Sequence, residues 1–196
     1  MPESPARPAA PGPEPTGAED EIPNNIERLM AFTGGERVKE FLKMVLENEK
    51  EPDSQNWMTL LLPHLHFVSA ASPPASPTLR VTFRHTVQPE HCNGLGNMHG
   101  GCTATLFDFC TSVAIAASPD LRPGFWSRLG VTRTLSTTYL RPAPRGEAVL
   151  IECEVAQLGR RMCALRAVMM REVDGALLAT CEHGKVNTDP PAAAKL

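Results

Sequence analysis

A single carboxylate in an apolar stretch is the first feature of this sequence that could do chemistry. Between Cys102 and Ser118 the one charged side chain is Asp108, and its neighbours are small, apolar or hydroxyl residues. A lone buried carboxylate is costly unless a partner forms a hydrogen bond with it. Two interpretations remain open: Asp108 is a general base or nucleophile, or it is a structural anchor bonded to a nearby threonine or backbone group.

A glycine-rich loop lies directly before this stretch. Gly100 and Gly101 have no Cβ, so a ligand can come close to the backbone N–H groups at the positive end of the helix that follows. Such N–H groups can stabilise a developing oxyanion. We interpret His99 as a group that orients this end of the site, although alone it could equally be a satisfied loop histidine.

Other chemistries fit the same loop poorly. The spacing from Gly94 to His99 lacks the third glycine of a dinucleotide-binding fingerprint, and no βαβ unit surrounds it. The nearby histidines and cysteines match no standard zinc spacing, so we expect no metal; they are His91, Cys92, His99 and Cys102. The chain also has no Gly-x-Ser-x-Gly elbow and no Walker loop.

These residues need secondary-structure elements to position them. Apolar residues recurring every three or four positions predict one long helix over residues 102–117, with one apolar stripe that contains Cys102, Leu106, Phe109, Val113 and Ala116. Alternating or continuous apolar runs predict strands over residues 64–68, 79–87, 131–140, 148–158, 162–173 and 176–186. Asp174-Gly175 predicts a hairpin, because its turn requires positive φ angles.

The order of these elements predicts one α+β domain over residues 56–188. Apolar residues at helical spacing predict an N-terminal helical segment over residues 23–55. Residues 1–22 are rich in Pro, Ala and Glu and predict a disordered tail, and residues 189–196 predict a short C-terminal tail.

Composition excludes several classes of function. A formal net charge of -3 argues against a general nucleic-acid-binding protein. We expect no membrane span, because we count no apolar run of the roughly 18 to 20 residues that a span needs. The cysteines lack disulfide-framework spacing, which favours free thiols in a reducing compartment. Because the N-terminal residues are acidic rather than rich in Arg, we expect a cytoplasmic protein, with the mitochondrion second.

The loop and helix together resemble a known family. Residues 93–101, Asn-Gly-Leu-Gly-Asn-Met-His-Gly-Gly, followed by Thr-Leu-Phe-Asp at 105–108, resemble the signature of hotdog-fold acyl-CoA thioesterases, in particular the phenylacetyl-CoA thioesterase-like branch. The resemblance extends from about Leu79 to Asn187. It implies a six-stranded antiparallel sheet wrapped around one long helix, an edge-to-edge homodimer, often a pair of such dimers, and an acyl-CoA substrate without any cofactor.

The resemblance also implies roles for individual residues. The N–H of Gly100 would polarise the thioester carbonyl, and Asn93 and His99 would shape that end of the site. Asp108 would activate the attacking oxygen, and Thr132 would hold the water. The path of coenzyme A would follow a further set of residues, namely Gly101, Thr134, Tyr139, Gly159, Arg160, Arg161 and Lys185.

Helix geometry predicts that two subunits share this site. His99 and Asp108 would lie about 13 Å apart and on opposite sides of one helix, whereas a two-fold axis can bring them together from two chains. Two other functions remain as alternatives: a hotdog-fold hydratase or dehydratase, and a catalytically silent acyl-CoA-binding or assembly protein. Residues 119–128, with Phe125 and Trp126, either cap the acyl tunnel or cover an edge of the core.

Overall fold

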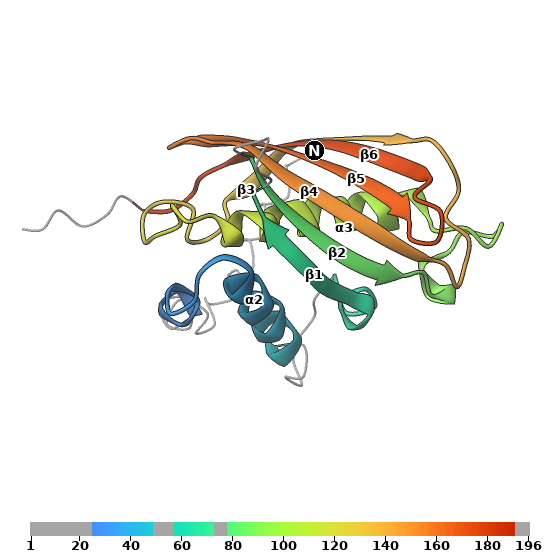
Figure 1. The fold of residues 1–196 in the computed structure, drawn as a ribbon, viewed down its shortest axis with the longest axis horizontal. Coiled ribbons are helices and arrows are strands. Elements are labelled where there is room, and N and C mark those ends of the chain that lie inside the picture. The colour runs from blue at the N-terminus through green and yellow to red at the C-terminus, as the bar shows by residue number, and fades with distance from the viewer. Residues whose placement is uncertain (1–24, 49–56, 73–77, 191–196) are drawn as a thin grey trace, which may run out of the picture.

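The computed structural model describes residues 25–48, 57–72 and 78–190 (Figure 1). The helices are α2 (Gly34–Asn48) and α3 (Gly100–Ala114), and residues 25–30 are also helical. The strands are β1 (Leu65–Ala71), β2 (Leu79–Thr86), β3 (Val131–Tyr139), β4 (Ala148–Leu158), β5 (Met162–Arg171) and β6 (Leu177–Val186). The predicted strands, long helix and N-terminal helices are confirmed. The tail predicted for residues 1–22 lies outside the described residues.

The strands form one antiparallel sheet in the order β1-β2-β4-β5-β6-β3. This sheet curls over α3, which lies along its concave face (Figure 1). Along β4 the side chains of Val149, Ile151 and Cys153 are fully buried while the residues between them are only partly buried, because alternate side chains of a strand point to opposite faces. The predicted six-stranded sheet around one long helix is therefore confirmed.

The sheet covers only one side of α3. Of the predicted apolar stripe, Leu106, Val113 and Ala116 are buried in the core, and Cys102 and Phe109 are partly buried and pack against it. Cys110, outside the predicted stripe, is also fully buried. A helix that is apolar nearly all round gives a weak periodic signal, so its buried face depends on where the sheet lies.

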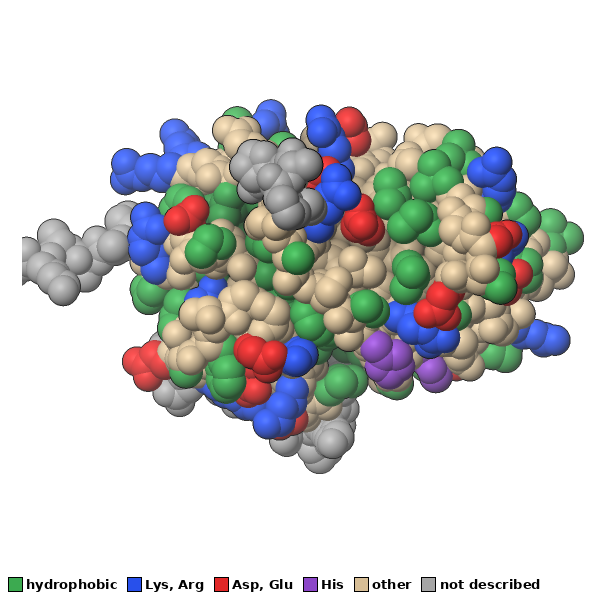
Figure 2. Space-filling model, in the orientation of Figure 1, with side chains coloured by type: hydrophobic (Ala, Val, Ile, Leu, Met, Phe, Trp, Pro, Cys, Tyr) green, Lys and Arg blue, Asp and Glu red, His purple; other side chains and the backbone are tan. Residues whose placement is uncertain are grey.

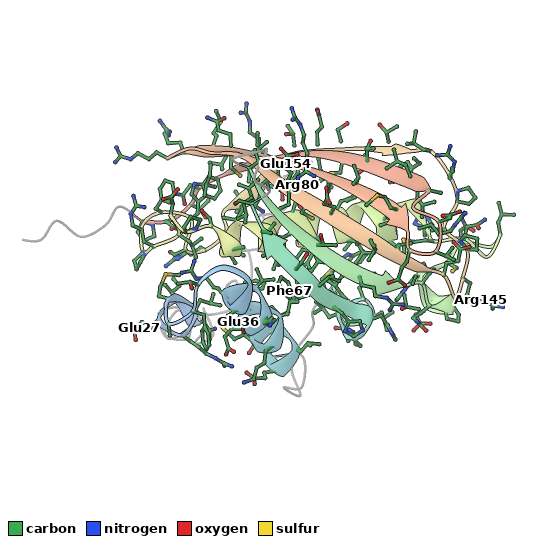
Figure 3. The ribbon with its side chains drawn as sticks, viewed as in Figure 1. Glu27, Glu36, Phe67, Arg80, Arg145 and Glu154 are labelled. Atoms are coloured by element: carbon green, nitrogen blue, oxygen red, sulfur yellow. The ribbon has the colours of Figure 1, made fainter. Side chains whose placement is uncertain are left out.

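The N-terminal helices are fixed to the far end of α3 by one buried arginine. Arg37 Nη1 donates to the carbonyl oxygens of Ala116 at 3.2 Å and Ser118 at 3.0 Å, where the helix leaves backbone acceptors unpaired. On the other side of α2, Phe67 of β1 packs so close to Gly35 that a Cβ there would lie 2.8 Å from the Phe67 ring (Figure 3). These contacts hold α2 against both α3 and β1.

The surface of the N-terminal helices mixes charges of both signs (Figure 2). Arg28 pairs with Glu47 at 2.9 Å and also with Glu40, and Lys39 pairs with Glu36 at 2.7 Å. Glu40 is partly buried, but the pairs of Arg28 with Glu47 and of Lys39 with Glu36 are exposed, and exposed pairs contribute little to stability. The position of these helices therefore depends on Arg37 and on apolar packing.

Residues 119–128 cover an edge of the core at Trp126. The Trp126 side chain is fully buried, and its Nε1 donates to Gly159 O at 2.7 Å. Asp189 accepts hydrogen bonds from the backbone N–H groups of Ser127 at 2.6 Å and Arg128 at 3.0 Å. Asp189, after the end of β6, thus ties the chain to residues 127–128.

By length and composition alone, the stretch Gly100–Ala117 could cross a membrane, contrary to our expectation that no run is long enough. The stretch consists of α3 and the 3-10 turn that follows it. Its one charged residue, Asp108, leaves it apolar enough to cross a membrane by composition. In the structure more than half of it is buried beneath the sheet. The core helix of a soluble protein has the same composition, so this stretch is weak evidence for a membrane span.

Candidate functional site

Asp108 lies in a polar cluster formed by α3, β3 and β6. Thr132 Oγ1 donates to Asp108 Oδ1 at 2.5 Å, and His183 Nε2 lies 3.3 Å from the same oxygen. Lys185 Nζ donates to Ser112 Oγ at 2.7 Å and lies 3.5 Å from Thr132 Oγ1. The Asp108 side chain contacts β3 and β6 on one side and is still 43% exposed. The carboxylate is therefore both hydrogen-bonded and open to a ligand.

The register of β3 and β6 brings these side chains together. His183 and Lys185 are two residues apart on β6, so both point inward, and both are buried. On β3 the pairing shifts between Thr132 and Thr134, which face Lys185 and Gly184 respectively. Such bulges redirect side chains and are common beside functional sites. A Cβ at Gly184 would lie 2.6 Å from Thr134 Oγ1, so any larger residue there would displace the Thr134 hydroxyl.

Hydrogen-bond partners define the protonation of His183. Thr111 Oγ1 lies 2.6 Å from Phe107 O, a carbonyl that can only accept, so Thr111 is the donor in that bond. His183 Nδ1, 2.6 Å from the same hydroxyl oxygen, must therefore donate, which leaves Nε2 as the acceptor of a neutral ring. Burial and the nearby Lys185 lower the pKa of His183 to about 4, against the opposing effect of Asp108. The ring is neutral at pH 7.

Thr132 has one proton and two neighbouring acceptors. Its oxygen lies 2.5 Å from Asp108 Oδ1 and 3.0 Å from His183 Nε2. The acceptor that does not receive the Thr132 proton can take a proton from another molecule. A half-exposed carboxylate with a spare acceptor beside it is suited to general-base catalysis.

The beginning of α3 offers a backbone donor. His99 is the N-cap residue, and its Nδ1 accepts the N–H of Gly101 at 2.9 Å. Among the described residues, no acceptor pairs with the N–H of Gly100, which is the first residue of the helix. Unpaired N–H groups at a helix N-terminus attract negatively charged oxygen. This N–H is thus available to polarise a carbonyl.

A pocket of about 390 Å³ opens beside Gly100, and Tyr139 and Asn93 line it. Tyr139 Oη donates to Gly100 O at 2.8 Å, and a Cβ at Gly100 would lie 3.3 Å from the Tyr139 ring. Asn93 Oδ1 accepts the backbone N–H groups of Leu95 at 2.9 Å and Asn97 at 3.3 Å. The Asn93 side chain therefore shapes the loop at the mouth of this pocket.

The residues that the resemblance assigned to the coenzyme A path lie in different places. Thr134 and Tyr139 are exposed on β3, whereas Lys185 is buried in the Asp108 cluster. The turn between β4 and β5 carries Arg160 and Arg161, which border a separate pocket of about 810 Å³. Gly159 precedes them on the same turn and accepts the bond from Trp126.

Sequence reasoning assigned no role to His183, Thr111 or Ser112. A signal for His183 was present, since it occupies an inward position on a strand whose other inward residues include Ala179 and Cys181. A histidine among buried apolar residues requires polar partners. Nothing in the local pattern identified those partners on α3.

No three His, Cys, Asp or Glu side chains in the described parts of the chain lie close enough to hold a metal ion. His91 already uses both ring nitrogens: Nδ1 accepts from Gln88 N–H at 3.0 Å, and Nε2 bonds to Leu60 O at 2.9 Å. The six cysteines are free thiols, and four of them are buried.

Comparisons with known proteins agree on one family. The thioesterase superfamily profile matches residues 95–177. The chain is 31% identical over 106 residues to acyl-coenzyme A thioesterase 13 of Homo sapiens. The aligned region covers 54% of this chain and 71% of that protein. Zebra fish thioesterase superfamily member 2 has a TM-score of 0.62 at 26% identity, covering 76% of this chain and 96% of that one. A hypothetical thioesterase of Streptococcus pneumoniae, solved with coenzyme A, shares the fold, with a TM-score of 0.53 at 20% identity. The match covers 66% of this chain and 90% of that one.

Proposed function

This chain belongs to the thioesterase superfamily, and from that premise we propose that two copies of it form a site that hydrolyses acyl-CoA to a carboxylic acid and coenzyme A. Its relatives named acyl-coenzyme A thioesterase 13 support the substrate class. The separate positions of Gly100 and Asp108 on α3 support the sharing of the site.

The observation that carries the proposal is that β3 runs antiparallel along α3. Thr132, near the start of β3, bonds to Asp108, and Tyr139, at its end, bonds to Gly100. Within one chain, Gly100 and Asp108 are about 12 Å apart along the helix axis. One chain therefore does not bring the backbone donor and the carboxylate to the same carbonyl.

A second copy supplies what the first lacks. β3 is the last strand of the sheet, and no described residue pairs with its outer edge, where Val131 and Tyr139 are exposed. Open strand edges with apolar side chains favour pairing with another strand. Antiparallel pairing of β3 with its copy about a two-fold axis would bring the Thr132 end of one strand to the Tyr139 end of the other. Asp108 of one subunit would then face Gly100 of its partner.

In this site the reaction needs no group beyond protein and water. The N–H of Gly100 polarises the thioester oxygen, while the Thr132 hydroxyl holds the attacking water. As the water oxygen adds to the carbonyl carbon, Asp108 takes its proton, and the neutral His183 supplies the neighbouring acceptor. Collapse of the tetrahedral intermediate breaks the C–S bond, and the departing thiolate takes the proton that Asp108 held.

Coenzyme A would leave the site past Tyr139, Thr134 and Gly101, with Arg160 and Arg161 as candidates for its phosphates. Arginine side chains suit phosphate because they donate two parallel hydrogen bonds. Lys185 is better assigned to the Asp108 cluster, where burial lowers its pKa.

Release of free thiol from a panel of acyl-CoA substrates tests the proposed activity directly. We expect thiol release with wild-type protein. Binding of acyl-CoA without thiol release would favour the silent binding protein, and hydration of an unsaturated acyl-CoA without thiol release would favour the hydratase.

Mixed dimers test the shared site. Asp108→Asn and Gly100→Pro proteins are each expected to be inactive, but after co-refolding a mixed dimer has one intact site. With random pairing, about half of the dimers are mixed, so activity should recover to roughly a quarter of wild type. Mixed dimers that are verified by mass and remain inactive would show that each site lies within one chain.

A further inference from the structure

An apolar pocket of about 420 Å³ lies between the N-terminal helices and α3. Its apolar lining includes Ile26, Leu29, Phe41, Val45, Phe109 and Leu129. The volume is within the range that small-molecule ligands occupy. Burial of CH₂ groups against such a lining is favourable, so the pocket suits an apolar chain.

One end of this pocket touches the Asp108 cluster. Ser112 and Lys185 belong to its lining, and Lys185 Nζ bonds to Ser112 Oγ at 2.7 Å and lies 3.5 Å from Thr132 Oγ1. Thr132 in turn bonds to Asp108. An acyl group whose carbonyl carbon lies at Asp108 could therefore extend directly into the apolar part of the pocket.

The far wall of the pocket comes from a part of the chain that the family profile does not match. Phe41, Met44 and Val45 are on α2, and Ile26 precedes them, whereas the profile begins at residue 95. The wall is held firmly, because Arg37 ties α2 to the end of the α3 segment and Phe41 packs on Phe109 with ring centroids 6.4 Å apart. The depth of the pocket is therefore set by α2.

We infer that the N-terminal helices, residues 25–48, form the far wall of an acyl pocket and make this chain selective for acyl-CoA with long apolar chains over acetyl-CoA. The inference rests on the proposed thioesterase function. It identifies Val45 and Phe41 as residues that determine chain length, from a position opposite the carboxylate rather than within the catalytic cluster.

A filling substitution on α2 tests this inference. Val45→Trp fills the pocket, so the ratio of kcat/KM for dodecanoyl-CoA to that for acetyl-CoA should fall by about tenfold or more. Leu46→Trp is the matched control, because Leu46 is the next residue on α2 and lines a different surface hollow with Lys43 and Phe67. It should leave the ratio unchanged.

An enlarging substitution tests the same wall in the opposite direction. Phe41→Ala removes a lining ring, so the preferred acyl chain should become longer across a panel from acetyl- to palmitoyl-CoA. Thermal unfolding of each variant verifies that it is folded. Equal chain-length profiles in wild type and both pocket variants would overturn the inference alone, whereas a wild-type protein that releases thiol from no acyl-CoA would overturn the proposed function as well.

Discussion

Gly100, at the start of α3, and Asp108, about two turns further along the helix, provide different kinds of functional group. We call these two places the Gly100 end and the Asp108 end of the site. At Gly100 the group is a backbone N–H, and His99 and Tyr139 hold the helix start around it. At Asp108 the groups are side chains: a carboxylate, the Thr132 hydroxyl and a buried imidazole. A backbone amide does not titrate, whereas a carboxylate and an imidazole do. The Gly100 end should therefore depend on backbone geometry, and the Asp108 end on side-chain identity and pH.

The largest effect is expected at the Asp108 end. Asp108→Asn keeps the size of the side chain but removes the general base, so kcat should fall by about 10² to 10⁴ while KM changes only a few-fold. Steady-state thiol-release kinetics measure both constants. Glu182→Gln, an exposed carboxylate on the outer face of β6, is the control and should retain normal turnover. Normal turnover by Asp108→Asn would contradict the assignment.

At the Gly100 end, the same assay should distinguish the effect of losing the N–H from the effect of adding a Cβ. Gly100→Pro removes the donor at a helix position that accommodates proline, and loss of one such donor lowers kcat by about 10² to 10³. Gly100→Ala keeps the N–H but adds the same Cβ, 3.3 Å from the Tyr139 ring. It should retain far more activity. Equal losses in the two variants would indicate crowding of Tyr139 instead of a missing donor.

The Asp108 end should also make stability depend on pH. Burial, with Lys185, holds the pKa of His183 at about 4 in the folded chain, below the unfolded value of about 6.5. As pH falls from about 6.5 to 4, the unfolded chain binds a proton at this residue that the folded chain does not. The contribution of His183 to the free energy of unfolding is therefore complete above about pH 6.5 and is lost as pH falls through this window. The loss is on the order of 3 kcal/mol at pH 4.

Urea unfolding at pH 7 and pH 4.5 measures this dependence. His183→Gln should have a smaller difference between the two free energies of unfolding than wild type. The exposed His66→Gln should keep nearly all of the wild-type difference, because His66 is the smallest of the influences that lower the pKa of His85. His85, buried with its pKa lowered to about 3, contributes in the same direction in all three proteins. An unchanged difference in His183→Gln would mean that His183 does not carry this proton linkage.

The smallest effect is expected outside both the Gly100 end and the Asp108 end of the site, on the turn between β4 and β5. If Arg160 and Arg161 bind phosphate, replacing both with Ala should raise KM a few-fold and weaken its dependence on salt, with kcat preserved. Arg166→Ala, an exposed arginine of β5, is the control for net charge. A KM that responds to neither the double substitution nor salt would remove the two arginines from the path of coenzyme A.

The sequence by itself determined the elements and the two chemically active ends. Residue alternation and helical spacing are local properties, so they predicted every strand and the long helix closely. Asp108 stood out because it is the one charge in an apolar helix, and Gly100 because a residue without Cβ exposes backbone at a helix start. These inferences require only the neighbours of each residue along the chain.

The tertiary structure decided which distant side chains meet Asp108 and how exposed it is. His183 is 75 residues later in the chain, and it reaches Asp108 because β6 lies between β5 and β3 in the sheet. Lys185 is buried in the same cluster for the same reason. The helix is apolar on nearly all sides, so only the placement of the curled sheet determines that Asp108 meets β3 and β6 and stays partly exposed. Strand order and sheet curvature result from long-range packing, which local sequence patterns do not encode.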